Sequence, residues 1–428
     1  MADAGSWVES ANDSSTGFPI QNLPYALFRT PDLKTPSLGV GIGELILDLR
    51  LCVGAGLLSS LPQETQEACR SDQMNALMAL GQQHWSGLRA RLTELLGAEL
   101  DDWRTNRRLV GPLLTPISSA QLLVPAAIGD YTDFYASLDH ALNVGRLFRP
   151  EQPLFANYKY VPIAYHGRSS SIVVSGTPIP RPSGQRMPPS ATAPVFGPTE
   201  VLDYELEIGL FVGPGNRQGK PIPIAQAEQH IFGLCLVNDW SARDIQRWEY
   251  MPLGPFLSKS FATSISPWVV PMQALEPFRA PFSRPIEDPE PLPYLRLADT
   301  SCAALNVTLV AEFTSEAMRA QGSCPIVLTK SNLRHLYWTL PQLIAHHTSN
   351  GCNLLPGDLL ATGTVSGPTP ESRGCLLEST HGGRDALQLP TGEQRTYLDL
   401  GDEVVIRGWC EREGFPRISF GECRGRVL

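Results

Sequence analysis

Short runs of apolar and β-branched residues, separated by Gly, Pro and polar clusters, recur along the chain from about residue 120 to the end. Runs of this length and composition predict strands. They are SSSIVVSG, ELEIGLFVG, IFGLCLVND, SPWVVP, ALNVTLVAEF, DLLATGTV and GDEVVIRGWC. The pattern indicates a mainly β (α+β) fold, a β-sandwich or roll with a few inserted helices. The Pro-rich segment VPMQALEPFRAPFSRPIEDPEPLPY predicts a loop, because prolines at that density disfavour both helices and strand ladders.

The first part of the chain has a different pattern. It mixes a strand-like run, GVGIGELILDLRL, with a helical stretch, QMNALMALGQQHWSGLRARLTELLG, and contains no recognisable group of chemical side chains. We therefore predict a small N-terminal domain over residues 1–120 and a second domain over residues 121–428.

The segment DYTDFYASLDHALNVGRLFR, residues 130–149, predicts one helix with Asp130 or Thr132 as its cap and Gly145 and Pro150 as stop signals. In such a helix Asp133 and His140, seven positions apart, would lie on one face. Two interpretations remain open from this segment alone. In one, Asp133 simply complements the helix N-terminus while His140 faces water; in the other, both side chains belong to a site.

Two carboxylates lie two positions apart in VLDYELEIGLFVG. A strand would place Glu205 and Glu207 on the same face. Carboxylates roughly 7 Å apart repel by about 2 to 3 kcal/mol at an effective dielectric near 20, so a buried pair needs a cation or a proton. Ligand sets made only of oxygen favour Ca²⁺ or Mg²⁺. An exposed strand face without a metal is the alternative.

The segment IFGLCLVNDWSARDIQRWEYMPLGPFLSKSFATS places Asp239 where an apolar strand gives way to a helix. Ser241 and Asp244 resemble a capping box for that helix. Arg243, Gln246 and Tyr250 follow at steps of three and four residues, which would align them in one stripe. Each residue also has an ordinary structural interpretation, such as a cap or a surface charge.

Further along, NLLPGDLLATGTVSGPTPESRGCLLEST contains a loop rich in Gly and Thr. Its amides and the Thr364 hydroxyl could hold a ligand carboxylate or carbonyl. Glu378 follows within an apolar stretch that we predict to be a strand. A carboxylate in that setting stays buried only with a partner, and a histidine is a natural one.

Composition narrows the function. A net charge of -9 over 428 residues, without a basic run, argues against nucleic acid and anionic membranes as partners and favours a small molecule. Nine scattered cysteines without a C-x-x-C spacing fit free thiols in a reducing compartment, and the N-terminus has no apolar leader, so we predict a cytoplasmic protein. GPGNRQGK is a poor phosphate loop, GVGIGE is not a dinucleotide fingerprint, and neither G-x-S-x-G nor H-E-x-x-H occurs.

Several longer motifs resemble the fumarylacetoacetate hydrolase family. They are DYTDFY with His140 and Arg149, YHGRSSSIVVSGTPI, ELEIGLFVGPGN, NDWSARDIQRWEY, PLGPFLSKSF and GDLLATGTVSGP. The resemblance covers roughly residue 120 to the end, and the N-terminal part is compatible with the SH3-like small barrel of that family. It implies a homodimeric enzyme with a β-sandwich roll that hydrolyses the carbon-carbon bond of 4-fumarylacetoacetate to fumarate and acetoacetate, the last step of tyrosine and phenylalanine (homogentisate) catabolism.

Carried over residue by residue, the resemblance also implies roles. It implies a Ca²⁺ or Mg²⁺ site formed by Asp133, Glu205, Glu207 and Asp239, and a second cation, usually Mg²⁺, near Asp239, Lys259 and Thr263. It implies substrate contacts from Tyr135, Arg149, Gln246, Tyr250 and Thr364. It further implies His140 as the general base, oriented by Glu378, with Arg243, Gln246 and Lys259 stabilising negative charge.

Related decarboxylases, isomerases and acylpyruvate hydrolases share this metal-carboxylate fold, so the fold alone does not fix the substrate. A histidine in the segment after Asp133 and the separate N-terminal domain favour the diketone hydrolase. A Ca²⁺-stabilised binding protein without turnover is a further alternative, and in that case a pairing of His140 with Glu378 would be accidental.

Overall fold

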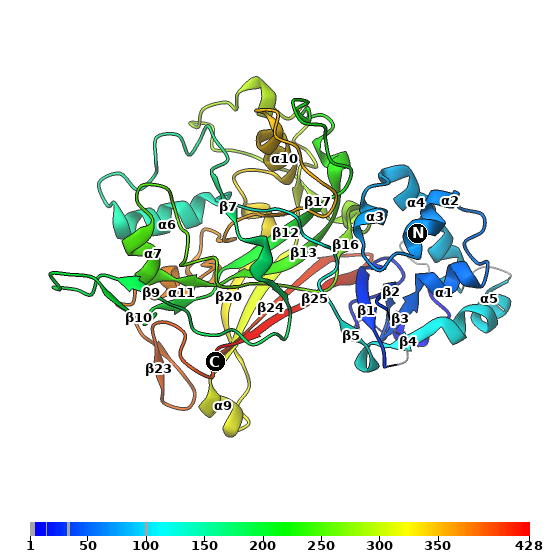
Figure 1. The fold of residues 1–428 in the computed structure, drawn as a ribbon, viewed down its shortest axis with the longest axis horizontal. Helices are drawn as coiled ribbons and strands as arrows, with labels where there is room; N and C mark the ends of the chain where they lie inside the picture. The colour runs from blue at the N-terminus through cyan, green and yellow to red at the C-terminus, as the bar shows by residue number, and fades with distance from the viewer. Residues whose placement is uncertain (1–4, 14, 32–34, 99–101) are drawn as a thin grey trace.

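The computed structural model of the chain describes residues 5–13, 15–31, 35–98 and 102–428. Two parts are visible in Figure 1, a smaller one formed by the N-terminal residues and a larger one formed by the rest of the chain. Strands outnumber helices in the larger part, as the sequence predicts. The mainly β fold is therefore confirmed. Among the helices of the described ranges, none combines the length and the hydropathy needed to cross a lipid bilayer.

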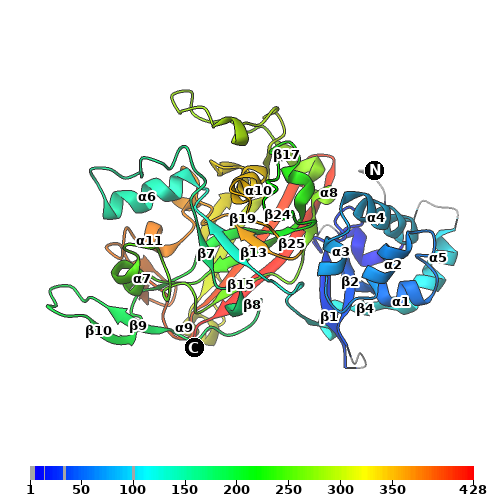
Figure 2. The ribbon, with the colours of Figure 1, turned by 45° about the horizontal axis from the view of Figure 1, so that its top comes forward.

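The N-terminal part contains one antiparallel sheet covered by helices (Figure 2). In spatial order the strands are β4 (Leu114–Pro116), β3 (Leu45–Asp48), β2 (Ser37–Ile42), β1 (Tyr25–Arg29) and β5 (Gln121–Leu122). The helices are α1 (Leu49–Gly54), α2 (Gln63–Cys69), α3 (Asn75–Met78), α4 (Gln82–Leu96) and α5 (Trp103–Val110). Helix α4 buries Trp85, Leu88, Leu92 and Leu95 at steps of three and four residues, which is the helical spacing that makes one face apolar.

An eight-stranded sheet forms the centre of the larger part. Its order is β7 (Ala164–Gly167), β6 (Tyr131–Phe134), β21 (Leu359–Ala361), β12 (Leu206–Val212), β13 (Ile231–Asp239), β15 (Thr263–Ile265) and β8 (Ile172–Val174), with β16 (Val270–Pro271) also paired to β13. Every residue of β12 and β13 is buried. Their sequences are apolar in almost continuous runs because both faces of these central strands are covered.

A four-stranded sheet covers one face of the central sheet. Its order is β20 (Ile326–Asn332), β19 (Thr308–Thr314), β24 (Glu403–Arg412) and β25 (Phe415–Arg426). Ile208 and Leu236 of the central sheet belong to the same continuous core as Leu309 and Ile406 of the four-stranded sheet. The two sheets therefore pack face to face, with alternate side chains of each directed into the shared core.

The N-terminal part covers the opposite face of the central sheet. Phe232 of the central sheet packs against Tyr25 and Trp85, with ring centroids 5.4 Å and 5.1 Å away. Tyr25 and Val269 also exchange backbone hydrogen bonds of 2.9 Å and 2.8 Å. One hydrophobic core consequently spans both parts of the chain.

The remaining elements are short. The two-stranded sheets are β9 (Ser183–Arg186) with β10 (Val195–Pro198), β11 (Leu202–Asp203) with β14 (Ser241–Ala242), β17 (Arg279–Ala280) with β18 (Ala304–Leu305), and β22 (Leu387–Gln388) with β23 (Gln394–Arg395). The helices are α6 (Leu138–Phe148), α7 (Arg243–Glu249), α8 (Met272–Leu275), α9 (Glu316–Ala320), α10 (Leu340–Thr348) and α11 (Leu376–Ser379). The nine cysteines are free thiols, as predicted.

The prediction of a single helix over residues 130–149 is wrong. Tyr131–Phe134 is strand β6, paired in parallel with β21, and the helix begins only at Leu138. Its cap is Ser137, whose hydroxyl accepts from the His140 amide at 3.3 Å. Gly145 lies inside the helix and does not end it. A side chain at this position would collide with the backbone of Pro153.

Three smaller predictions are also wrong. Glu378 lies on helix α11 rather than on a strand. Helix α7 begins at Arg243 without a side-chain cap, because Ser241 is part of strand β14, so the capping box does not form. The Pro-rich segment is largely irregular but contains helix α8 and strand β17.

Candidate functional site

Four carboxylates from separate parts of the chain meet at one end of the central sheet. One oxygen from each of Asp133, Glu205, Glu207 and Asp239, the acidic cluster, lies within 4.8 Å of the others. All four side chains are buried, so the alternative of an exposed strand face for Glu205 and Glu207 is wrong. The structure thus places side by side the four residues that the sequence analysis assigns to a metal site.

The register of the sheet explains this convergence. Glu207 pairs with Val237 on the neighbouring strand, which puts Asp239, two residues later, on the same face. Asp133 pairs with Ala361, which in turn shares a strand pair with Gly209, so it also points to that face. Alternation along three strands therefore gathers side chains that lie far apart in the sequence.

Two cations compensate part of the charge. The Lys259 ammonium donates to Glu205 and, at 2.7 Å, to Asp239. The Arg243 guanidinium contacts Glu205 at 2.7 Å and Asp203 at 2.9 Å. Although burial favours the neutral form, Lys259 and Arg243 hold the pKa of Glu205 at about 2. Glu205 is therefore ionised at neutral pH.

The other half of the cluster lacks partners. Asp133 Oδ1 and both carboxylate oxygens of Glu207 are buried without a hydrogen bond among the described residues. Burial, followed by the repulsion of neighbouring carboxylates, raises the pKa of Asp133 and of Glu207 well above their ordinary values. Buried oxygens of this kind are costly unless a cation or a proton satisfies them. The donor set contains only oxygen, so it fits a hard divalent ion such as Ca²⁺ or Mg²⁺.

Asp239 has further donors around it. Thr263 on β15 donates to its Oδ1 at 3.2 Å, and the Tyr165 hydroxyl on β7 donates to its Oδ2 at 2.8 Å. Lys259 thus contacts the site as a hydrogen-bond donor, and an ammonium has no lone pair to offer to a metal. The second cation near these residues stays a prediction.

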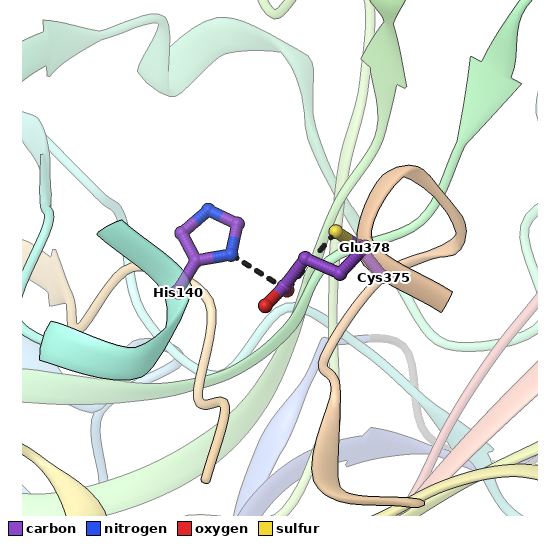
Figure 3. A group of neighbouring side chains, drawn as sticks. All are labelled: His140, Cys375 and Glu378. Carbon is purple, nitrogen blue, oxygen red and sulfur yellow. Dashed lines mark hydrogen bonds and ion pairs between the residues drawn. The ribbon is translucent and has the colours of Figure 1, made fainter. Parts of the chain in front are cut away.

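A histidine and a glutamate form a second group beside the cluster. His140 Nδ1 lies 2.7 Å from Glu378 Oε2, and both side chains are almost completely buried. Figure 3 shows the other ring nitrogen pointing away from Glu378. Glu378 also accepts from Asn143 at 2.9 Å, from Ser366 at 2.8 Å and from the Cys375 thiol at 3.3 Å.

These contacts favour the ionised form of Glu378. Burial opposes ionisation of Glu378, but His140 and then the hydrogen bonds from His140, Asn143 and Ser366 lower its pKa to about 2. The neutral imidazole tautomer with its proton on Nδ1 can donate that proton to an ionised Glu378, and in this tautomer Nε2 keeps a lone pair. An imidazole held in this way can act as a general base.

His140 and part of the acidic cluster line one cavity of about 540 Å³. The five predicted substrate-contact residues all line it, and so do Asp133, His140, Glu205, Arg243 and Lys259. The five are Tyr135, Arg149, Gln246, Tyr250 and Thr364. Glu207, Asp239, Thr263 and Glu378 lie behind this lining rather than in it. The sequence predictions are therefore brought together in space.

Two of the predicted substrate-contact residues have a donor without an internal partner among the described residues. The Thr364 hydroxyl and the Arg149 Nε are buried and make no hydrogen bond within the described parts of the chain. Arg149 also stacks over the Phe155 ring at 4.1 Å. Unpaired donors at a cavity wall are suited to a ligand that carries carboxylate or carbonyl oxygens.

Sequence reasoning missed some members of the site. Asp203 holds Arg243, and its carboxylate also accepts from the amides of Leu376 and Leu377 at 2.8 Å and 3.0 Å, at the start of α11. It precedes Glu205 by two positions, so the period of two could have revealed it. Tyr165 and the run from Met251 to Pro255 were given no role, although Tyr165 opens the motif YHGRSSSIVVSGTPI and Pro252 opens PLGPFLSKSF.

Family models match almost the whole chain. The model described as fumarylacetoacetate (FAA) hydrolase C-terminal matches residues 130–428, and the one described as fumarylacetoacetase N-terminal matches residues 21–125. Among curated proteins, fumarylacetoacetases of Rattus norvegicus and Homo sapiens are each 48% identical and cover 99% of this chain and 98% of the relative. That of Arabidopsis thaliana is 47% identical over 100% and 99%.

A solved structure gives an independent view of the fold. The fumarylacetoacetate hydrolase from psychrophilic Exiguobacterium antarcticum superposes with a TM-score of 0.51 at 16% identity, covering 95% of this chain and 99% of that one. At that identity the likeness concerns the fold alone.

Proposed function

We propose, since the chain belongs to the fumarylacetoacetate hydrolase family, that it is a carbon-carbon bond hydrolase. Its reaction is the cleavage of 4-fumarylacetoacetate to fumarate and acetoacetate. This reaction is the last step of tyrosine and phenylalanine catabolism through homogentisate. One observation carries the proposal: an oriented His140–Glu378 pair opens into the same cavity as the acidic cluster, in a chain that is 48% identical to named fumarylacetoacetases.

His140 starts the reaction. Its Nε2, left with a lone pair by the bond between Nδ1 and Glu378, takes a proton from a water molecule. The water oxygen then bonds to a carbonyl carbon of the diketone. Glu378 stabilises the imidazolium that forms, and it remains ionised because its pKa is about 2.

Bond cleavage follows from the adduct. The carbon-carbon bond breaks, its electron pair moves onto the neighbouring carbon, and the charge spreads to the second carbonyl oxygen as an enolate. The His140 imidazolium returns the proton to the leaving carbon, so water is added across the broken bond and no charge is left over. Arg243, Gln246 and Lys259 line the cavity and donate toward the negative charge that develops on oxygen.

The acidic cluster would hold Ca²⁺ or Mg²⁺ through Asp133, Glu205, Glu207 and Asp239. Support comes from the buried oxygens of Asp133 and Glu207 that have no partner among the described residues, and from a donor set of oxygen only. When bound, such an ion supplies a Lewis acid that polarises the attacked carbonyl. A second Mg²⁺ near Lys259 and Thr263 remains part of the proposal, with Lys259 as a charge partner rather than a ligand.

Binding of the substrate is assigned to five residues of the cavity wall. Arg149 and Thr364 would bind the carboxylates, supported by their unpaired buried donors within the described chain. Tyr135, Gln246 and Tyr250 would position the diketone, supported by their place in the same lining.

The organisation of the protein completes the proposal. We assign the N-terminal part to an SH3-like domain and the rest of the chain to the catalytic β-roll. The five-stranded antiparallel sheet supports this division, and its strand β5 (Gln121–Leu122) moves the boundary from residue 120 to just after Leu122. The family resemblance supports a homodimer. Nine free thiols support a cytoplasmic location, because a reducing compartment keeps thiols unpaired.

An absorbance assay tests the activity directly. Hydrolysis removes the conjugated diketone, so its absorption decays as the enzyme turns over. We expect His140→Ala to lower kcat by at least about 10³-fold while the circular dichroism and the bound metal stay as in the parent protein. Normal turnover by that variant would refute the role of His140, and faster consumption of a pyruvate-type substrate would favour an acylpyruvate hydrolase.

A further inference from the structure

One loop at the mouth of the cavity connects two groups of site residues. This rim loop, residues 250–257, follows helix α7, which carries Arg243 and Gln246, and it ends two residues before Lys259. Its residues 250–255 line the cavity without interruption. The position of the rim loop therefore sets the shape of the cavity mouth and the approach to the site.

Packing does not hold the rim loop in place. Leu253 is 95% exposed, Met251 69% and Phe256 68%. Apolar side chains exposed to this extent contribute almost no burial energy to a fixed loop conformation. Polar contacts must therefore order this segment.

The Gly254 amide donates to the Tyr250 carbonyl at 2.6 Å, and the Phe256 carbonyl accepts from the Ser260 amide at 2.9 Å. The side-chain contacts across the base of the loop come from a single carboxylate. Glu249, the last residue of α7, accepts from the backbone amides of Phe256 and Ser258 at 2.8 Å and 2.9 Å through one oxygen, and from the amide of Leu257 at 3.1 Å through the other. The Ser258 hydroxyl donates to the first oxygen at 2.7 Å. Four donors from the far end of the loop thus converge on the residue that precedes its near end.

We propose that Glu249 is a positioning residue that closes the rim loop across its base and thereby sets the affinity for the substrate. It does not line the cavity, so it acts through the loop and not by contact with the reacting atoms. The inference rests on the proposed function, since the affinity concerned is that for the diketo acid. A charged acceptor makes stronger hydrogen bonds to amides than a neutral one does, which is why the carboxylate matters.

Glu249→Gln tests this directly. It keeps the size of the side chain but replaces one acceptor oxygen with an amide that must face an N–H donor. Because Glu249 is only partly buried, we expect the variant to fold with an unchanged unfolding midpoint. We expect KM for fumarylacetoacetate to rise about tenfold while kcat changes by less than about threefold, the pattern of lost binding common to ground and transition states. Glu413→Gln, at an exposed turn between β24 and β25, is the matched control for loss of one surface charge and should leave both constants unchanged.

Two further measurements separate positioning from a simple charge effect. Brief chymotrypsin treatment with mass spectrometry of the fragments should give new cleavage at Tyr250, Phe256 or Leu257 in Glu249→Gln but not in the parent protein. Ser258→Ala removes one of the four donors and should raise KM less, and the double variant Glu249→Gln/Ser258→Ala should be no worse than Glu249→Gln alone.

The outcomes are distinct. An unchanged KM, a fall in kcat at constant KM, or a raised KM without new cleavage in the rim loop would each overturn the inference. If the parent protein itself fails to hydrolyse fumarylacetoacetate, the proposed function fails. The cleavage measurement then still reports whether Glu249 orders the loop.

Discussion

We predict that the affinity of the protein for a divalent ion depends strongly on pH. The affinity is measured by removing divalent ions from the protein and titrating them back. This pH dependence arises in the acidic cluster, where Asp133 Oδ1 and both oxygens of Glu207 have no hydrogen-bond partner in the described structure. In the metal-free protein, burial and then neighbouring carboxylates raise the pKa of both groups well above 3.8 and 4.5, their ordinary values. Protons thus occupy part of the place that a cation would take.

The sign of the effect follows from linkage. A carboxyl whose folded pKa is raised binds its proton more tightly when folded, so its stabilising contribution is complete below the ordinary pKa. That contribution is lost as pH rises through the raised value. A divalent ion needs the ionised forms, so its binding must release the protons of Asp133 and Glu207. Metal affinity should therefore increase with pH across the window between the ordinary and the raised pKa values.

The magnitude depends on the number of protons released. Each proton makes the apparent Kd change about tenfold per pH unit. At a Ca²⁺ concentration about 100 times Kd, binding stabilises the folded protein by about 2.7 kcal/mol. One pH unit lower, the same concentration should give about 1.4 kcal/mol if one proton is released and about 0.4 kcal/mol if two are released.

Calorimetric titration of chelator-treated protein with Ca²⁺ at about pH 6.5 and about pH 7.5, in buffers of different ionisation enthalpy, measures both Kd and the protons released. Glu207→Gln removes one of the two titrating groups, so it should weaken binding and reduce the pH dependence by about one proton. Glu413→Gln should behave like the parent protein. Equal Kd values at both pH values, or no proton release, would refute the reasoning from the unpaired oxygens.

Three further predictions concern Glu378 and Arg243. We expect Glu378→Gln to lower kcat by about 10² to 10⁴-fold with little change in KM, because a neutral amide no longer fixes the proton on Nδ1 of His140. Steady-state kinetics measure both constants. A kcat equal to that of the parent protein would contradict the prediction. The pKa of Glu378 is lowered from 4.5 to about 2 in the folded protein. Its ionised form therefore stabilises the fold above pH 4.5, and this contribution is lost as pH falls to about 2. Acid unfolding, and not a measurement near neutral pH, should reveal it. Arg243→Met should destabilise the fold by about 3 to 5 kcal/mol, since it leaves the buried carboxylates of Asp203 and Glu205 without their shared partner. Urea unfolding measures this loss, and a difference under about 1 kcal/mol would show that the pairing contributes little.

The central strands could be predicted from the sequence because their pattern is simple. Strands β12 and β13 are apolar runs bounded by polar residues, and the period of two places Glu205 and Glu207 on one side. Asp239 was placed correctly at the end of its strand for the same reason. Local pattern and tertiary environment agree at these positions, so local reasoning succeeds.

The segment before His140 was mispredicted because tertiary pairing overrides its helical spacing. Tyr131 and Asp133 pair with Leu359 and Ala361, more than two hundred residues away, and no local signal announces that partner. The site was nevertheless found, because Asp133 and His140 need only be close in space. They line one cavity from the two sides of a strand-to-helix corner and not from one helix face.

Helix α11 shows a second limit of local reasoning. Its first amides are bound by Asp203, which lies more than 170 positions earlier in the chain. A helix whose start is satisfied by a distant carboxylate carries no capping signal in its own sequence. The partnership of Glu378 with His140 was still predictable, because a buried carboxylate demands a partner whatever its backbone conformation.

The contact of Phe232 with Tyr25 and Trp85 has a consequence for how the chain can vary. The N-terminal residues cover the face of the central sheet opposite the four-stranded sheet. The larger part of the chain therefore depends on them to bury that face. A shortened polypeptide that lacks them would expose this hydrophobic surface to water and aggregate. Insertions and substitutions should accordingly be tolerated better at the outer loops of the N-terminal part than at this contact between the two parts.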